Sequence, residues 1–295
     1  MDYSEDRPLY DVIADVTLLE PVLVIMLEGW VDAGLGASSA MSSLLTSSPT
    51  ELLATFDGDR LLDQRARRPV ARIVDGITES LTWPEIQLRV GVDATGRDVC
   101  YLVGPEPDMH WGPFIDAVVD LASRLDVRLV VGLGAFPAPA PHTRPVRLAA
   151  TVPSESAKLL EHVGLVAGEL EVPAGISSAL ELGFGEAGID MITLWARVPH
   201  YVAAMPFPQA SAALIDGLGR VAGLSLDTTV LHEEADVARR QVDELISSNP
   251  EHAAMVRALE STLDATEGNP LGVDELPTGD ELAAELEQFL RGEQP

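Results

Sequence analysis

The sequence predicts an α/β protein whose sheet is mostly parallel and is covered by helices on both faces. Short apolar runs of strand length alternate along the chain with stretches of helical periodicity. Several runs are almost continuous in Val, Ile and Leu, which is typical of strands buried on both faces. The expected strands are Val22–Leu27, Val70–Val74, Ile86–Val92, Val99–Val103, Leu129–Leu133, Val146–Val152 and Ile189–Val198.

The expected helices of the α/β part follow from apolar residues repeating every three or four positions. They are Leu35–Leu45, Phe114–Leu125, Ser154–Val163, Ile176–Leu182 and Pro208–Val221. The pattern changes near Ser225, after which no strand-like run occurs. The same region contains 17 acidic residues and only 4 basic ones. We therefore expect an α/β core domain over residues 1–225 and an acidic helical region over residues 226–295. Its expected helices are Thr229–Ile246, Glu251–Leu263 and one that begins at the capping-box sequence Thr278-Gly-Asp-Glu281.

Composition excludes several classes of partner. The 295-residue chain is 46% apolar, which supports a sizeable core, and it carries a formal net charge of −28. That charge would repel the phosphates of nucleic acids and of anionic membranes. The acidic N-terminus does not match a signal peptide, and the run Val22–Leu27 is far shorter than a membrane span. We expect a soluble cytoplasmic protein.

The stretch LEGWVDAGLG (27–36) directly follows the first expected strand. Gly29 and Gly34 have the spacing of a phosphate-binding loop, but Leu35 and Gly36 stand where such a loop carries Lys and Ser or Thr. The dinucleotide pattern GxGxxG is also incomplete, because Ser39 occupies the place of its third glycine.

The acidic residues of the same stretch argue further against a nucleotide. Glu28 and Asp32 add negative charge where a phosphate would lie, whereas Trp30 offers an aromatic surface to a partner or a subunit. We therefore interpret the stretch as a sharp turn between a strand and a helix.

Three further loops follow strands and should lie on the same rim of the sheet. In GPEPDMHWGPF (104–114), Asp108 is expected to cap a helix, with Trp111 packed beneath it. In GLGAFPAPAPHTRP (132–145), alternating prolines stiffen the loop that carries His142 and Arg144. The tripeptide Pro-His-Tyr201 ends another strand.

In open parallel sheets, ligands bind in the crevice outside the carboxyl ends of the strands. The residues expected to form a ligand- or partner-binding rim there are Glu28, Trp30, Asp32, Asp108, Trp111, His142, Arg144, His200 and Tyr201. An alternative is that the 132–145 loop is simply rigid and is held by salt bridges of its arginine. No residue is assigned a catalytic role.

Several chemistries lack the residues that they need. The six histidines show no spacing typical of metal ligands, and Gly175-Ile-Ser-Ser-Ala179 lacks the second glycine of a serine-hydrolase elbow. Cys100 lies within an apolar run and is expected to be buried and inert, and Lys158 is the only lysine available for phosphoryl transfer. We expect neither a metal nor a cofactor.

Five segments together resemble the proteasome assembly chaperone 2 family, in particular its actinobacterial branch. They are LEGWVDAG (27–34), GPEPDMHWGPF (104–114), GLGAFPAPAPHTRP (132–145), GISSALE (175–181) and VPHYVAAMPFPQAS (198–211). The resemblance runs from about Leu18 to Leu231, and its most specific part is PHTRP followed by PHY. It implies a Rossmann-like, phosphorylase- or hydrolase-like fold, homo-oligomers and a chaperone or scaffold role in building proteasomes. Some archaeal relatives dock into proteasome α rings through a tail with a penultimate Tyr, which this chain's FLRGEQP does not match.

Two functions of different classes follow from these observations. The first is a non-enzymatic homo-oligomer, such as a trimer, that binds other proteins, among them proteasome-related ones. A cluster of arginines beside the excess of acids favours pairing between subunits; it consists of Arg60, Arg65, Arg67, Arg68 and Arg72. The alternative is a binder or enzyme for a nucleoside-like small molecule that uses the rim residues Asp32, Asp108, His142 and Arg144.

Overall fold

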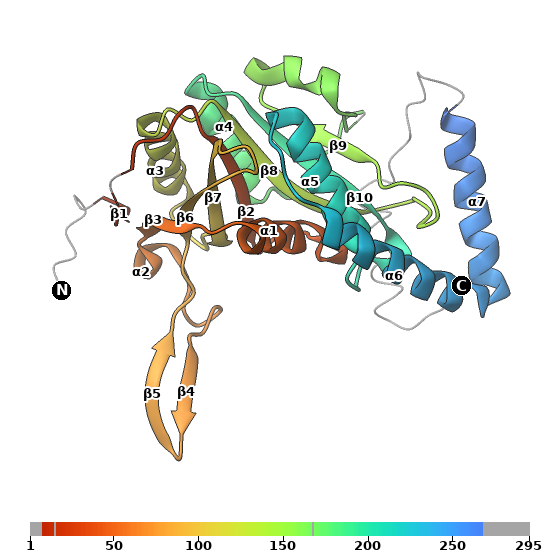
Figure 1. The fold of residues 1–295 in the computed structure, drawn as a ribbon, viewed down its shortest axis with the longest axis horizontal. Helices are drawn as coiled ribbons and strands as arrows, with labels where there is room; N and C mark the ends of the chain where they lie inside the picture. Colours follow the sequence, from red (N-terminus) through yellow and green to blue (C-terminus); the bar gives the residue numbers. More distant parts are fainter. Residues whose placement is uncertain (1–7, 15, 167, 268–295) are drawn as a thin grey trace.

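A computed structural model describes residues 8–14, 16–166 and 168–267 of the chain. It has one eight-stranded sheet with helices on both faces and a separate two-stranded hairpin that projects from the body (Figure 1). In this part of the chain, none of the helices combines the length and the apolar character needed to cross a lipid bilayer.

Four parallel strands form the centre of the sheet. The strand order is β1-β3-β6-β7-β2-β8-β10-β9, in which β7, β2, β8 and β10 are mutually parallel and the strands on either side are antiparallel. The bounds are β1 Tyr10–Val12, β2 Val22–Glu28, β3 Glu51–Phe56, β6 Gln87–Val92, β7 Asp98–Pro105, β8 Leu129–Ala138, β9 Leu148–Thr151 and β10 Met191–Pro199. The predicted α/β class is confirmed, with the parallel pairing in the centre of the sheet.

The sheet separates two apolar cores, and β2 contributes to both. Val22, Val24 and Met26 belong to one core, whereas the alternating residues Leu23 and Ile25 belong to the other. Successive side chains of a strand point to opposite faces, so a strand covered on both sides has no polar positions. This is why its run of apolar residues is nearly continuous.

Helices cover each core. α1 (Gly36–Ser47) and α5 (Pro208–Ala222) pack together on one face, and α3 (Trp111–Arg124) and α4 (Ile176–Glu186) pack together on the other. The short helices are η1 Ala33–Leu35, α2 Gly58–Leu61, η2 Ser154–His162 and η3 His200–Val202. The segment η2 was expected to be α-helical but is a 3₁₀ helix. Ser156 and Leu159 both face the protein interior, and their spacing matches three residues per turn.

The last two described helices pack beyond α5. They are α6 (Thr229–Ser247), whose buried side chains include Leu231 and Val242, and α7 (Pro250–Glu267). The connection to them is anchored at Ser225, whose backbone N–H donates to Asp93 at 2.8 Å. Although burial alone would raise the pKa of Asp93, four hydrogen bonds to its carboxylate lower that pKa to about 2. The helix expected after Thr278 lies outside the described residues.

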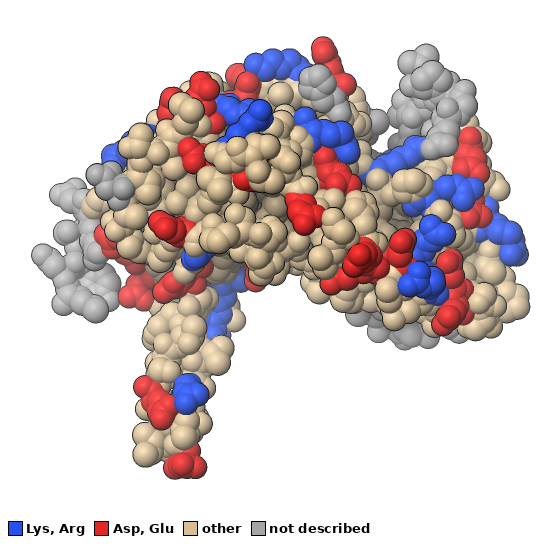
Figure 2. Space-filling model, viewed as in Figure 1, with Lys and Arg blue, Asp and Glu red and all other residues tan. Residues whose placement is uncertain are grey.

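The hairpin consists of β4 (Val70–Val74) and β5 (Ile77–Thr82). Val70–Val74 is a strand as predicted, but it pairs only with β5. The sequence analysis missed β5, and it also missed β1 and β3. Asp75 and Gly76 connect the two strands with positive φ angles, as an Asp-Gly hairpin turn requires. Figure 2 shows that most of the projecting surface is uncharged.

Candidate functional site

Asp32 fills the position that a phosphate occupies in a phosphate-binding loop. Its carboxylate accepts hydrogen bonds from the backbone N–H of Ala37 at 2.7 Å, from the N–H of Ser38 at 3.0 Å and from the Ser38 hydroxyl at 2.6 Å. These groups lie in the first turn of α1, where free N–H groups and the helix dipole attract an anion. The protein therefore supplies its own anion at this helix end.

The glycine-rich turn is held against the start of α5. The N–H of Gly34 donates to Ala203 O at 2.7 Å, and its carbonyl accepts from Phe207 N at 2.8 Å. Gly34 has a φ of +64°, and an added Cβ would lie 2.7 Å from Cβ of Phe207. Asp32 also pairs with Ala135 of β8, so the chain itself covers the ends of the central strands.

Asp108 is not the helix cap that the sequence predicted. The residue before α3 is His110, which makes no side-chain capping bond. The Asp108 carboxylate instead accepts from Asp63 N at 2.8 Å and from Arg67 Nε at 3.1 Å, because the segment after α2 runs past it. Trp111 lies beside this loop and donates from Nε1 to Pro107 O at 2.6 Å.

Glu28 and Trp30 lie where β2 meets α4. The Glu28 side chain is exposed, and its carbonyl accepts from Glu106 N at 2.7 Å. The Glu106 carboxylate in turn accepts from Ile176 N, at the N-terminus of α4. Trp30 packs on Gly175, where an added Cβ would lie 3.0 Å from the indole, yet it remains 45% exposed.

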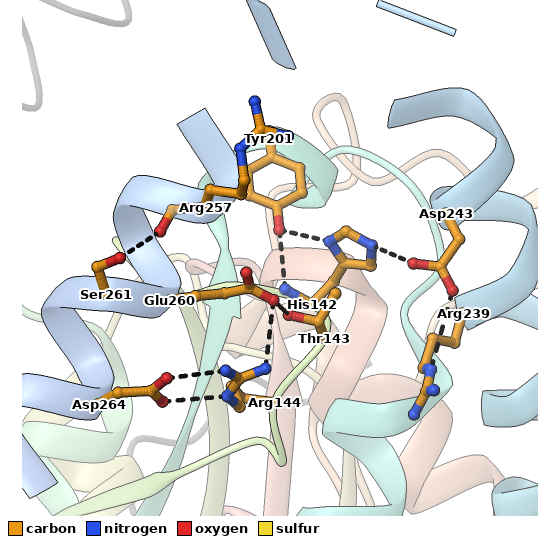
Figure 3. Close-up of polar contacts among 10 residues, drawn as sticks. All are labelled: His142, Thr143, Arg144, Tyr201, Arg239, Asp243, Arg257, Glu260, Ser261 and Asp264. Atoms are coloured by element: carbon orange, nitrogen blue, oxygen red, sulfur yellow. Dashed lines mark hydrogen bonds and ion pairs between the residues drawn. The ribbon is translucent and has the colours of Figure 1, made fainter. Parts of the chain in front are cut away.

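His142 is buried between Tyr201 and Asp243 (Figure 3). The Tyr201 oxygen accepts from the backbone N–H of His142 at 2.8 Å and lies 2.7 Å from the ring nitrogen Nδ1 of the same residue. The imidazole donates from Nε2 to Asp243 on α6 at 3.1 Å. Burial raises the pKa of the Tyr201 phenol to about 12, so it stays neutral at physiological pH. His200 stacks edge-on against Tyr201 and is exposed.

Arg144 binds the proline-rich loop to α7. Its guanidinium contacts Glu260 at 3.2 Å and Asp264 at 2.9 Å, and the Thr143 hydroxyl also donates to Glu260 (Figure 3). These are the salt bridges that the rigid-loop alternative predicted. Sequence reasoning missed the acidic partners Glu260 and Asp264, because α7 carries several acids and no pattern marks these two.

The predicted rim therefore has two separate parts. His142, Arg144, His200 and Tyr201 lie near α6 and α7, whereas Asp32 and Asp108 hold other protein groups. Among the described residues, no group of three or more His, Cys, Asp or Glu side chains could hold a metal ion. Cys100 is buried, which raises the pKa of its thiol to about 12. A binding role for the rim stays a prediction.

Glu181 is a buried carboxyl that sequence reasoning did not single out. It lies on α4 with 8% of its surface exposed, and its Oε1 accepts hydrogen bonds from Thr151 at 2.7 Å and from Thr193. Burial raises the pKa of Glu181, and the two hydroxyl bonds only partly offset that effect. The protonated form is therefore favoured more strongly in the folded than in the unfolded chain.

We expect Asp32→Ala to lower the free energy of unfolding by about 1–2 kcal/mol, because helix N-terminal N–H groups lose their acceptor. Glu28→Ala is the matched control, since the Glu28 side chain is exposed, and it should change stability by less than about 0.5 kcal/mol. Urea denaturation measures both. Equal effects of the two substitutions would show that Asp32 is not a structural anion.

We expect Glu181→Gln to change how stability depends on pH. The folded pKa of Glu181 is raised, so its favourable contribution is complete below the unfolded pKa and is lost as pH rises through the folded pKa. As pH rises above the ordinary range of a glutamate, the wild type should therefore lose stability relative to the variant until Glu181 is ionised in the folded protein. If the difference between the unfolding free energies of the wild type and the variant did not change with pH, the raised pKa would be contradicted.

Comparisons with known proteins agree with this architecture. The family model that matches is that of the PAC2 family, over residues 26–246. A search of curated proteins gives no match.

Solved structures give closer detail. A Mycobacterium tuberculosis protein of unknown function is 33% identical, with a TM-score of 0.81, over 91% of this chain and 96% of that one. A proteasome-assembly chaperone homologue from the same organism is 35% identical, with a TM-score of 0.73, over 80% and 99%. An archaeal proteasome activator from Pyrococcus furiosus shares the fold at 17% identity and a TM-score of 0.60, over 80% and 97%. The family match and these relatives show that the chain belongs to the PAC2 family.

Proposed function

We propose that this chain is a non-enzymatic, cytoplasmic homo-oligomer that binds other proteins during their assembly. The observation that carries the proposal is the hairpin β4–β5. Its exposed large apolar side chains are Val70, Ile73, Ile77, Leu81 and the adjoining Trp83, with exposed fractions of 45–72%. A two-stranded hairpin is marginally stable on its own in water, and burying one such side chain contributes about 1.5–3 kcal/mol. A second copy of the chain would cover these residues.

A second apolar surface supports the binding of partner proteins. Trp30 and Leu35 after β2, Met109 after β7 and Met205 after β10 are each 39–51% exposed. They lie past the carboxyl ends of three parallel strands, next to rim groups that already hold other parts of the protein. Exposed apolar and aromatic side chains of this kind favour a protein surface over a small polar substrate.

The relatives indicate the partner class. The mycobacterial relative at 35% identity is described as a proteasome-assembly chaperone homologue. We infer that subunits of a proteasome, or of a related particle, bind the surface around Trp30 and Leu35. The hairpin would serve self-association.

Light scattering tests the oligomer. We expect the full chain to have a mass that is a multiple of 31.5 kDa, three copies for a trimer, and Ile73→Ser with Ile77→Ser to reduce it to one copy. Arg72→Ser with Glu79→Ser is the matched control, because it removes an exposed ion pair of the same hairpin and should leave the mass unchanged. A wild type of one copy, or equal effects of both pairs, would disprove the role of the hairpin.

Co-expression with proteasome α and β subunits of the same organism tests the partner. We expect the α subunits to co-purify with the wild type and to be lost with Trp30→Ser combined with Leu35→Asn, since asparagine tolerates the positive φ of position 35. The light-scattering mass should not change. Leu19→Asn is the control, because Leu19 is 81% exposed before β2, at the opposite end of that strand. Failure of the wild type to retain α subunits would contradict the partner class and leave the oligomer intact.

A further inference from the structure

A cleft of about 710 Å³ lies beside His142, and α5 and α6 form two of its sides. Its walls come from the loop 142–148, from Gln209 to Arg220 along α5 and from His232 to Arg239 along α6. The volume falls within the range of about 300–1,000 Å³ that is typical of small-molecule sites. The cleft is concave and built from three elements, unlike the hairpin and the apolar rim.

Cationic side chains gather in this cleft although the protein is strongly acidic overall. Four arginines line it, together with His142 and His232; the arginines are Arg144, Arg147, Arg220 and Arg239. The carboxylates in the lining are Asp216 and Asp236, and Asp216 pairs with His232 at 3.2 Å. The lining thus has more cations than anions, in a chain whose net charge is −28.

Arg220 is the cation that the fold leaves available. Arg144 is bound to Glu260 and Asp264, and Arg239 lies 4.0 Å from Asp243. Arg220, in contrast, forms no hydrogen bond or ion pair with any of the residues that the structure describes, and it is exposed. One of its guanidinium nitrogens lies 3.9 Å from the place of an added Cβ at Gly217, a place that the Leu148 side chain already fills.

Gln209 joins α5 to α6 in the wall of the cleft. Its Nε2 donates to Ala235 O at 3.0 Å, but its Oε1 is buried in the described structure without any hydrogen-bond partner. Buried acceptors are nearly always satisfied, and Gln209 is part of the cleft wall. Because the protein itself covers this oxygen, a ligand in the cleft would meet the cationic side chains and not Gln209 Oε1.

We propose that this cleft binds a small-molecule oxyanion, a phosphate ester or a carboxylate. Arg220 is the principal anion ligand, because a guanidinium can donate two parallel hydrogen bonds to either group. Arg147 and Arg239 add positive charge beside it. The proposal adds a ligand site to the proposed protein-binding function and does not depend on it.

Calorimetric titration of the full chain tests the site with three probes. Ribose 5-phosphate and citrate separate the two oxyanion classes, and ribose is the uncharged control. We expect saturable binding of at least one anion, one molecule per chain, and no detectable binding of ribose. The better anion identifies the class. Binding of neither anion, or equal binding of ribose, would overturn the proposal.

Two variants and two controls locate the site. Arg220→Gln should weaken binding of the anion by about tenfold or more, since it removes a charged hydrogen-bond donor. Ala213→Leu should also weaken it, by filling the cleft without changing charge. Arg240→Gln is matched in chemistry and lies outside the lining of the cleft, and Arg124→Gln lies on α3; both should bind as the wild type does.

Circular dichroism confirms that the variants are folded. If Arg220→Gln and Arg240→Gln weaken binding equally, the anion responds only to overall charge and the cleft is not its site. If Ala213→Leu alone has no effect, the anion binds outside the enclosed part of the cleft, which also contradicts the proposal.

Discussion

The carboxylate of Asp32 at the N-terminus of α1 is the interaction on which the rest of this rim depends. It satisfies two backbone N–H groups of the helix and, through the pairing of Asp32 with Ala135, fixes the turn against β8. The same turn places Gly34 between Ala203 and Phe207, so the start of α5 is set by it as well. In folds with this sheet arrangement, the crevice beside these strands holds ligands. Here the protein's own chain and its own anion fill it.

Because that crevice is filled, the polar side chains of the rim bind other parts of the same chain. His142 joins Tyr201 to Asp243 on α6, and Arg144 joins the same loop to Glu260 on α7. The charged and polar groups that resembled a site from the sequence therefore hold the C-terminal helices in place. Three features remain for function: the hairpin, the exposed apolar side chains and the Arg-lined cleft, whose wall includes His142 and Arg144.

Local sequence patterns predicted most of the fold. The contacts that they did not predict join residues that lie far apart in the sequence. The runs of β2 and β10 are buried on both faces, so their composition alone identifies them. The dipeptide Asp75-Gly76 is typical of a hairpin turn, but the sequence analysis did not use it to predict the hairpin β4–β5. The partners of His142 and Arg144 lie 101 to 120 residues away on acidic helices, where no pattern distinguishes one carboxylate from its neighbours. Arg220 of α5 and Arg239 of α6 line one cleft only because α5 packs on α6.

The net charge of the chain explains why the proposed self-association would use a projecting hairpin. Copies of a chain with a charge of −28 repel one another, and that repulsion decays over a Debye length of about 8 Å at physiological salt. A six-residue strand such as β5 extends about 20 Å, well beyond that length. An arm of this reach, in which Arg72 and Glu79 pair and only Asp75 adds net charge, would allow apolar contact between copies while their acidic bodies stay apart. Self-association through the arm should therefore depend little on salt, whereas direct contact between the bodies would require high salt. Measuring the mass of the particle at low ionic strength distinguishes the two arrangements.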